Sequence, residues 1–138
     1  MLTGLWTVGI KVPDLERELA FHRQMGNGVV LDDTIEFEGE RYRVPLIRMG
    51  DKYVHIAERM VYERLLPAPL PYGIVHLVYR SDSIEQDVER ALATGAELFI
   101  ALTTVKAGFG TRRVAFFKSP SGYIFEMIEI LENLVPAV

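Results

Sequence analysis

The stretch FFKSPSGYIFEMIE, residues 116–129, decides how the rest of this sequence is interpreted. A short apolar strand runs into Ser119-Pro120-Ser121-Gly122, which is typical of a turn because proline presets one backbone angle and glycine tolerates positive φ. An apolar run then extends from Tyr123 to Ile130 and contains Glu126. Because an unpaired buried carboxylate is costly, Glu126 indicates a nearby cation, a bound metal or a catalytic role.

The same pattern occurs earlier in the chain. KYVHIAE at 52–58 aligns with YIFEMIE at 123–129 and places His55 on Glu126, at an offset of 126 − 55 = 71. Residues 7–30 likewise align with residues 76–99, placing Thr7 on His76 at an offset of 76 − 7 = 69. Such self-similarity indicates a duplicated structural unit, and this unit is a whole module of about half the chain.

Each half of the repeat predicts a β-α-β-β-β module within a single domain, residues 1–138. The first module, residues 3–58, should contain strands at 5–12, 29–37, 41–49 and 53–58, with a helix from Asp14 to Met25 and an irregularity at Pro45. Three prolines mark residues 59–72 as a linker. The second module, residues 73–130, should contain strands at 74–79, 97–104 and 111–118, a helix after Ser83 and the final strand.

Bulk composition excludes several classes of protein. The 138 residues carry a formal net charge of −4 and contain no clustered Lys or Arg, which argues against nucleic acid as a partner. With no cysteine, the chain has no disulfide framework and no thiolate metal site. No signal-peptide pattern and no apolar run of membrane-spanning length is visible, so we expect a cytoplasmic protein without a membrane partner.

Strand alternation places four repeat-related side chains on the sheet faces that the helices do not cover: Thr7, His55, His76 and Glu126. Two imidazoles and a carboxylate suit Fe, Mn, Zn, Ni or Co as divalent ions. The plainer alternatives are a core histidine at His76 and an ion pair between Glu126 and a basic residue. The candidates for that ion pair are Lys11, Arg43, Arg48 and Arg80. Arg112 and Arg113 are expected to lie at a solvated strand edge.

The sequence resembles the vicinal oxygen chelate superfamily, which includes glyoxalase I, bleomycin resistance proteins and extradiol dioxygenases. The resemblance rests on VGIKVPDLE at 8–16, on His76 in HLVYRSDSIE, and on residues 117–126, which match F-x-D-P-x-G-x-x-x-E except for Ser119. It implies an α+β fold in which two βαβββ modules form a cup-shaped mixed sheet around a divalent metal ion. It also implies ligands at His55, His76 and Glu126, with Thr7 departing from the usual residue.

Three functions follow as hypotheses. The first is a metal-dependent lyase, isomerase or epimerase, favoured over a dioxygenase, in which the metal binds a small oxygenated substrate and Glu126 serves as ligand or catalytic base. The second is a metal-free, antibiotic-type binding protein, and the third is a structural domain with a filled cup. The resemblance further implies a homodimer. The predicted pocket residues, besides Trp6 and the candidate ligands, are Thr7, Gly9, Tyr53, Phe117 and Tyr123.

Overall fold

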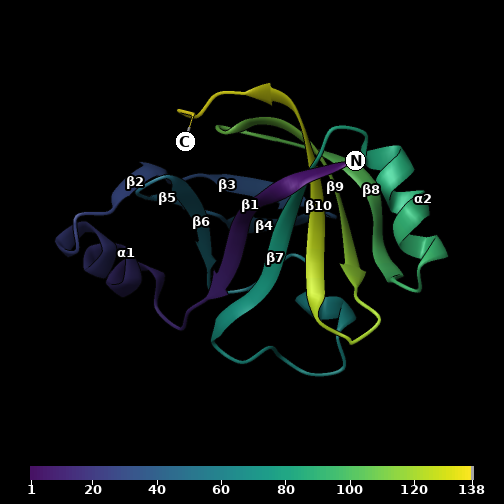
Figure 1. Ribbon diagram of the computed structural model, residues 1–138. Helices are drawn as coiled ribbons and strands as arrows, with labels where there is room; N and C mark the ends of the chain where they lie inside the picture. The colour runs from purple at the N-terminus through teal and green to yellow at the C-terminus, as the bar shows by residue number, and fades with distance from the viewer. Residues whose placement is uncertain (138) are drawn as a thin grey trace.

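The computed structural model describes residues 1–137 and contains a curled eight-stranded sheet with one helix against each half (Figure 1). The strand order is β2-β5-β6-β1-β7-β10-β9-β8. The first half comprises β1 (Leu2–Lys11), β2 (Gly28–Leu31), β5 (Leu46–Met49) and β6 (Lys52–Ala57). The second half comprises β7 (Gly73–Ser81), β8 (Glu97–Ala107), β9 (Gly110–Lys118) and β10 (Ile124–Asn133). This mixed, cup-like sheet confirms the predicted α+β fold of βαβββ type.

The two halves have the same strand pairing on either side of the central β1–β7 pair. In each half the first strand pairs in parallel with the last, β1 with β6 and β7 with β10. The halves join within one chain because β1 and β7 pair antiparallel, with Gly9 opposite His76. Gly9 is also opposite His55 on its other side. The repeat seen in the sequence therefore brings its candidate polar residues to the middle of one continuous sheet.

The two helices cover the outer face of the sheet. Helix α1 (Leu15–Gln24) is capped by Asp14, whose side chain accepts a hydrogen bond of 3.1 Å from the Arg17 backbone N–H. The helix buries Leu19 against β5 and β6. Helix α2 (Ile84–Ala93) packs on β9 and β10 through Ile84. None of the helices in residues 1–137 is long and apolar enough to cross a membrane.

The predicted hairpin of residues 29–37 and 41–49 is divided into four short strands. A separate two-stranded sheet, β3 (Thr34–Phe37) with β4 (Glu40–Arg43), leaves the main sheet between β2 and β5. Asp33 makes the first break, since its carbonyl accepts from Val44 N at 2.7 Å and its carboxylate from Gly108 N at 2.5 Å. Pro45, which cannot donate a ladder hydrogen bond, makes the second.

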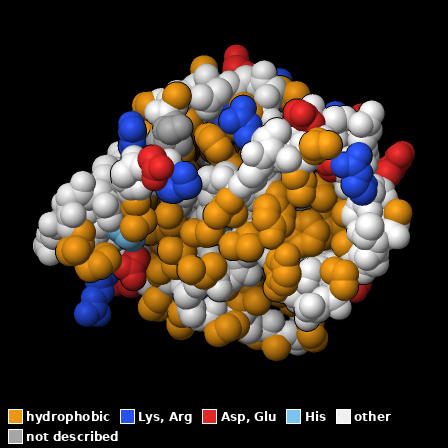
Figure 2. Space-filling model, in the orientation of Figure 1, with side chains coloured by type: hydrophobic (Ala, Val, Ile, Leu, Met, Phe, Trp, Pro, Cys, Tyr) orange, Lys and Arg blue, Asp and Glu red, His pale blue; other side chains and the backbone are white. Residues whose placement is uncertain are grey.

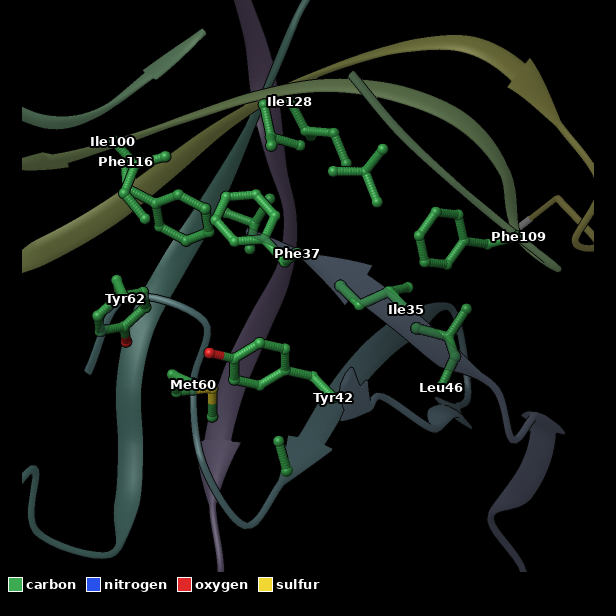
Figure 3. Packing of buried hydrophobic residues seen from close by; sticks show 14 of the residues in the cluster. Ile35, Phe37, Tyr42, Leu46, Met60, Tyr62, Ile100, Phe109, Phe116 and Ile128 are labelled. Atoms are coloured by element: carbon green, nitrogen blue, oxygen red, sulfur yellow. The ribbon is translucent and has the colours of Figure 1, made fainter. Parts of the chain in front are cut away.

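The concave face of the sheet carries the largest hydrophobic cluster (Figure 3). Strands contribute Phe116 and Ile128, and the β3–β4 hairpin adds Phe37 and Tyr42. The segment around the 3₁₀ helix η1 (Glu63–Leu65) adds Met60 and Tyr62, and the C-terminal segment adds Val135. Hairpin, linker and C-terminal segment thus pack over the concave face of the sheet.

Candidate functional site

A cavity of about 100 Å³ lies inside this cup. Its wall is mainly apolar and draws on both halves of the sheet, the β3–β4 hairpin and the linker. Few polar side chains reach it, a composition typical of small-molecule sites. The polar and charged lining residues, apart from a tyrosine and a tryptophan, are His55, Arg59, His76, Arg112 and Glu126.

His76 and Glu126 form the polar centre of the cavity. His76 Nε2 lies 3.7 Å from Glu126 Oε2, and both side chains are largely buried, at 7% and 13% exposure. The Tyr62 hydroxyl lies 2.8 Å from His76 Nδ1 and fixes the rotation of the imidazole. Beneath the ring lies Gly9, where an added Cβ would be 2.1 Å from His76 Cε1. A side chain at position 9 would therefore displace the imidazole.

Glu126 forms no ion pair with the basic residues considered from the sequence. Arg43 is bound to Asp32 and Glu16, and Lys11 to Glu63 at 2.8 Å. Within residues 1–137 only His76 comes within ion-pair distance of the Glu126 carboxyl group. The sequence therefore predicted the burial of Glu126 correctly, and the ion-pair alternative is wrong.

Burial controls the protonation of this centre. Desolvation raises the pKa of Glu126 to about 8. It lowers the pKa of His76 to about 3, with a smaller effect from His55, and it lowers the pKa of His55 to about 4 despite an opposing backbone contact with Pro45. The pKa of the Tyr62 hydroxyl is raised, again mainly by burial. Near neutral pH the imidazoles are therefore uncharged and Glu126 is mostly protonated.

The predicted metal site is not assembled by these side chains. No three His, Asp or Glu side chains of residues 1–137 are grouped closely enough to hold a metal ion. His55 Nδ1 is buried without a hydrogen-bond partner among residues 1–137, and the His55 and Phe109 rings lie edge to face, with their centroids 6.4 Å apart. The Thr7 hydroxyl donates to the Tyr53 carbonyl at 2.7 Å and is not available to complete a site. Catalytic zinc sites commonly use three protein ligands, so the observed pair does not fit one.

Two predicted pocket residues lie on the wrong face of the sheet. Phe117 packs toward α2, stacked on Phe125 at 5.1 Å, because side chains alternate along β9 and its neighbour Phe116 faces the cavity. Tyr123 is half exposed, and its hydroxyl lies 3.2 Å from that of Tyr79. Both expectations are therefore wrong.

The remaining predicted pocket residues lie behind the cavity wall. Gly9 lies beneath His76, while Thr7 and Tyr53 are fully buried and bond to backbone carbonyls, Tyr53 to that of Pro136 at 2.5 Å. They are absent from the cavity lining, whereas Trp6, 5.9 Å from Tyr53 between ring centroids, does line it. The prediction that these three residues line the pocket is therefore wrong.

Sequence reasoning missed two residues of the site. Arg112 was assigned to a solvated edge, yet it is only 3% exposed and lines the cavity. The register could have revealed it, since Phe116 pairs with Glu126 and alternation puts Val114 and Arg112 on the same face. Tyr62 gave no such signal, because a linker residue has no periodicity that predicts its partner.

Comparisons with known proteins place this fold. No family model matches the sequence, and no curated protein matches it. Among solved structures, a single-residue variant of methylmalonyl-CoA epimerase from Streptomyces coelicolor, in complex with 2-nitronate-propionyl-CoA, aligns with a TM-score of 0.72 at 19% identity, covering 96% of this chain and 100% of that chain. Methylmalonyl-CoA epimerase from Mycobacterium tuberculosis aligns with a TM-score of 0.69 at 20% identity, covering 95% and 90%. At this identity the likeness is one of fold, and the chain has the vicinal oxygen chelate fold.

Proposed function

We propose that this protein moves a proton at a carbon next to a carbonyl group of a small oxygenated substrate, as an isomerase or epimerase does. The observation that carries the proposal is the His76 Nε2–Glu126 Oε2 pair, 3.7 Å apart in an apolar cavity. A carboxyl group next to an imidazole, shielded from water, is a common arrangement for general acid–base catalysis. The epimerases among the structural neighbours support this class of reaction.

Each residue of the pair has a role that follows from its environment. Glu126 takes the proton from the α-carbon, and the electron pair of the broken C–H bond moves onto the carbonyl oxygen. With a pKa of about 8, Glu126 is a stronger base than an ordinary carboxylate and still about a tenth ionised at pH 7. Return of the proton from Glu126 to another atom of the resulting enolate gives an isomer, and return to the same carbon after the enolate has turned its other face to Glu126 gives the epimer.

His76 stabilises the oxygen that becomes negative. A neutral imidazole can donate a hydrogen bond to a developing oxyanion, and His76 is neutral because burial lowers its pKa to about 3. When the Tyr62 hydroxyl donates to Nδ1, the imidazole proton resides on Nε2, the nitrogen that faces Glu126. Tyr62 is thus a positioning residue that selects the useful tautomer.

A divalent metal ion, if bound, would act as a Lewis acid on the same carbonyl oxygen. His76 and Glu126 would be two of its ligands, but no third donor joins them in the described part of the chain. We therefore assign the steps to the side chains alone.

Solvent exchange tests the proposal directly. In D₂O, wild-type protein should exchange the α-proton of a 2-branched acyl thioester, with methylmalonyl-CoA as the first of a panel, as followed by NMR. Glu126→Gln should lower the exchange rate at least about 100-fold, while Glu97→Gln, exposed on the edge strand β8, should leave it unchanged. Binding of panel members without exchange would instead support the metal-free binding protein.

We also infer that the protein forms a homodimer. Hydrophobic side chains gather on the outer sheet face between the two helices (Figure 2), where Ile10 of β1 pairs with Ile74 of β7 and Ile74 is 67% exposed. Exposed apolar patches often mark association surfaces. Light scattering should give twice the mass of the 15.7 kDa chain, and Ile74→Glu should restore the monomer. A monomeric mass for wild type across micromolar concentrations would contradict this inference.

A further inference from the structure

Arg112 is a buried cation without a carboxylate partner. It is 3% exposed, and no ion pair to it is found within residues 1–137. Its neighbour Arg113 points to the other face and pairs with Glu85 and Glu129. A cation taken out of water is expensive unless it is paired, so the burial of Arg112 requires a reason that Arg113 does not share.

The hydrogen bonds of Arg112 satisfy only part of its guanidinium group. Nη1 donates to the backbone carbonyls of Thr111 and Glu132, and Nη2 donates to Asn133 Oδ1 at 3.0 Å. The group has five N–H donors. Nε–H and one N–H of Nη2 are therefore left without an acceptor in the described part of the chain. All three existing acceptors are uncharged, so none of them neutralises the positive charge.

A second arginine in this protein shows what these two kinds of donor can hold together. Arg43 binds the carboxylate of Asp32 in a bidentate manner, with Nε at 2.8 Å and Nη2 at 2.6 Å. These are the same two nitrogens that retain free donors in Arg112. The planar fork of arginine matches the two oxygens of a carboxylate.

The surroundings of Arg112 also favour an anion inside the cavity. The guanidinium lies 5.2 Å from the centre of the Phe109 ring, and the His55 ring, whose Nδ1 has no hydrogen-bond partner among residues 1–137, lies 6.4 Å from the same ring between centroids. Burial and the charge of Arg80 lower the pKa of Arg112, and the exposed Glu132 opposes them. The cavity end near Phe109 therefore offers positive charge and an unused polar atom.

We propose that Arg112 binds a carboxylate of the substrate, one remote from the carbon that reacts at His76 and Glu126. The separation follows from the register. Phe116 pairs with Glu126, and Arg112 lies four residues before Phe116 on β9, which is about 14 Å along the strand. The substrate class is then a small carbonyl compound with a carboxylate at its far end. This rests on the proposed function only in taking the cavity as the substrate site.

Binding at equilibrium tests the subsite without any reaction. The probe is 4-oxopentanoate, a small keto acid that fills the Arg112 subsite without having to reach the His76–Glu126 pair, and its neutral counterpart is 4-oxopentanamide. Trp6 is the only tryptophan and lines the cavity, so its fluorescence reports binding. The acid should bind at least about tenfold more tightly than the amide. Equal affinities, or no binding of the acid, would overturn the proposal.

Variants locate the effect. Arg112→Gln should reduce the affinity for the acid to that for the amide and leave the amide unaffected, whereas Arg113→Gln should change neither. Equal losses in both variants would mean a general electrostatic effect and would refute the assignment. Arg112→Lys, which keeps the charge but loses the fork, should fall between wild type and Arg112→Gln. If Arg112→Gln fails to fold, Arg112→Lys and the acid–amide comparison in wild type still decide the outcome.

Two further measurements separate a carboxylate subsite at Arg112 from a phosphate subsite and from a failure of the proposed proton transfer. Inorganic phosphate that competes as strongly as the acid would reassign the subsite to phosphate-type anions and overturn the carboxylate assignment. Glu126→Gln should bind 4-oxopentanoate as wild type does, although it should have lost proton exchange. A failure of the proposed function therefore appears in exchange alone, and a failure of the Arg112 subsite appears in binding alone.

Discussion

The two halves of the sheet share one scaffold but differ at the positions that carry chemistry. In the second half, His76 and Glu126 face each other at 3.7 Å. Their repeat-related counterparts in the first half are Thr7, whose hydroxyl donates to the Tyr53 carbonyl, and His55, whose Nδ1 has no hydrogen-bond partner in the described part of the chain. The repeat thus shares its backbone and its outward packing, while the proposed reactive centre is confined to one half. A repeated fold does not imply a repeated site.

The two halves meet at Gly9, and a side chain added at this position should have the largest effect on stability and on proton exchange. The added methyl group of Gly9→Ala would overlap the His76 imidazole at 2.1 Å, and overpacking of this kind costs about 1–3 kcal/mol. Urea unfolding should show that loss, together with loss of proton exchange. Gly28→Ala, where nothing lies within 4 Å of an added Cβ, is the control. Equal unfolding free energies for Gly9→Ala and wild type would mean that His76 does not occupy this position.

The pH dependence of stability should separate Glu126 from the histidines. The folded pKa of Glu126, about 8, is raised above its ordinary 4.5, so unfolding releases its proton and the free energy of unfolding falls as pH rises between these values. The pKa values of His55 and His76 are lowered from 6.5, so each histidine makes the free energy of unfolding rise with pH up to about 6.5. Below that pH the two histidines outweigh the single carboxyl group, and the net free energy of unfolding rises. Stability should peak there and fall by about 2 kcal/mol by pH 8.

Glu126→Gln should remove the decline above pH 6.5 and retain the rise below it. Urea titrations at half-unit pH steps would measure both limbs. A decline that persists unchanged in Glu126→Gln would show that another group titrates there and that Glu126 is not strongly desolvated.

Removing one hydroxyl group at a time compares Tyr62, which is hydrogen-bonded to His76, with Thr7, which is hydrogen-bonded only to the backbone. Tyr62→Phe and Thr7→Val each remove one buried hydrogen bond, worth about 1 kcal/mol of unfolding free energy. Only Tyr62→Phe should slow proton exchange, by about tenfold, or about 1.4 kcal/mol, because it releases the imidazole tautomer. If Thr7→Val slowed exchange as much, the first half of the repeat would be part of the reactive centre.

The smallest expected effect is that of added metal. Because no third donor joins His76 and Glu126 within residues 1–137, purified and dialysed protein should contain less than stoichiometric divalent metal, and Zn²⁺ or Mn²⁺ should leave exchange nearly unchanged. Elemental analysis and exchange assays would measure this. One tightly held ion per chain, lost in the His76→Ala, Glu126→Ala double variant, would restore the metal site inferred from the resemblance.

Periodicity alone determined much of this protein. The repeat, the βαβββ order and the face on which His55, His76 and Glu126 lie could all be derived from the sequence, because the alternation of side chains along a strand is a local property. The buried state of Glu126 followed from its apolar neighbours. The prediction that Phe117 and Tyr123 line the pocket was wrong. For Phe117 the sheet face was assigned one residue out of step, and Tyr123 lies one residue before the final strand begins.

Only the tertiary structure decided which polar groups meet. The Thr7 hydroxyl donates to a backbone carbonyl of the neighbouring strand, Tyr62 reaches His76 from a linker, and the buried Arg112 donates to the Glu132 carbonyl near the end of β10. These partners come from elements far apart in sequence, brought together by the curl of the sheet and the closure of its covering loops. No local pattern records such contacts, because hydrogen bonds and desolvation depend on the spatial neighbours of a residue rather than on its place in a strand.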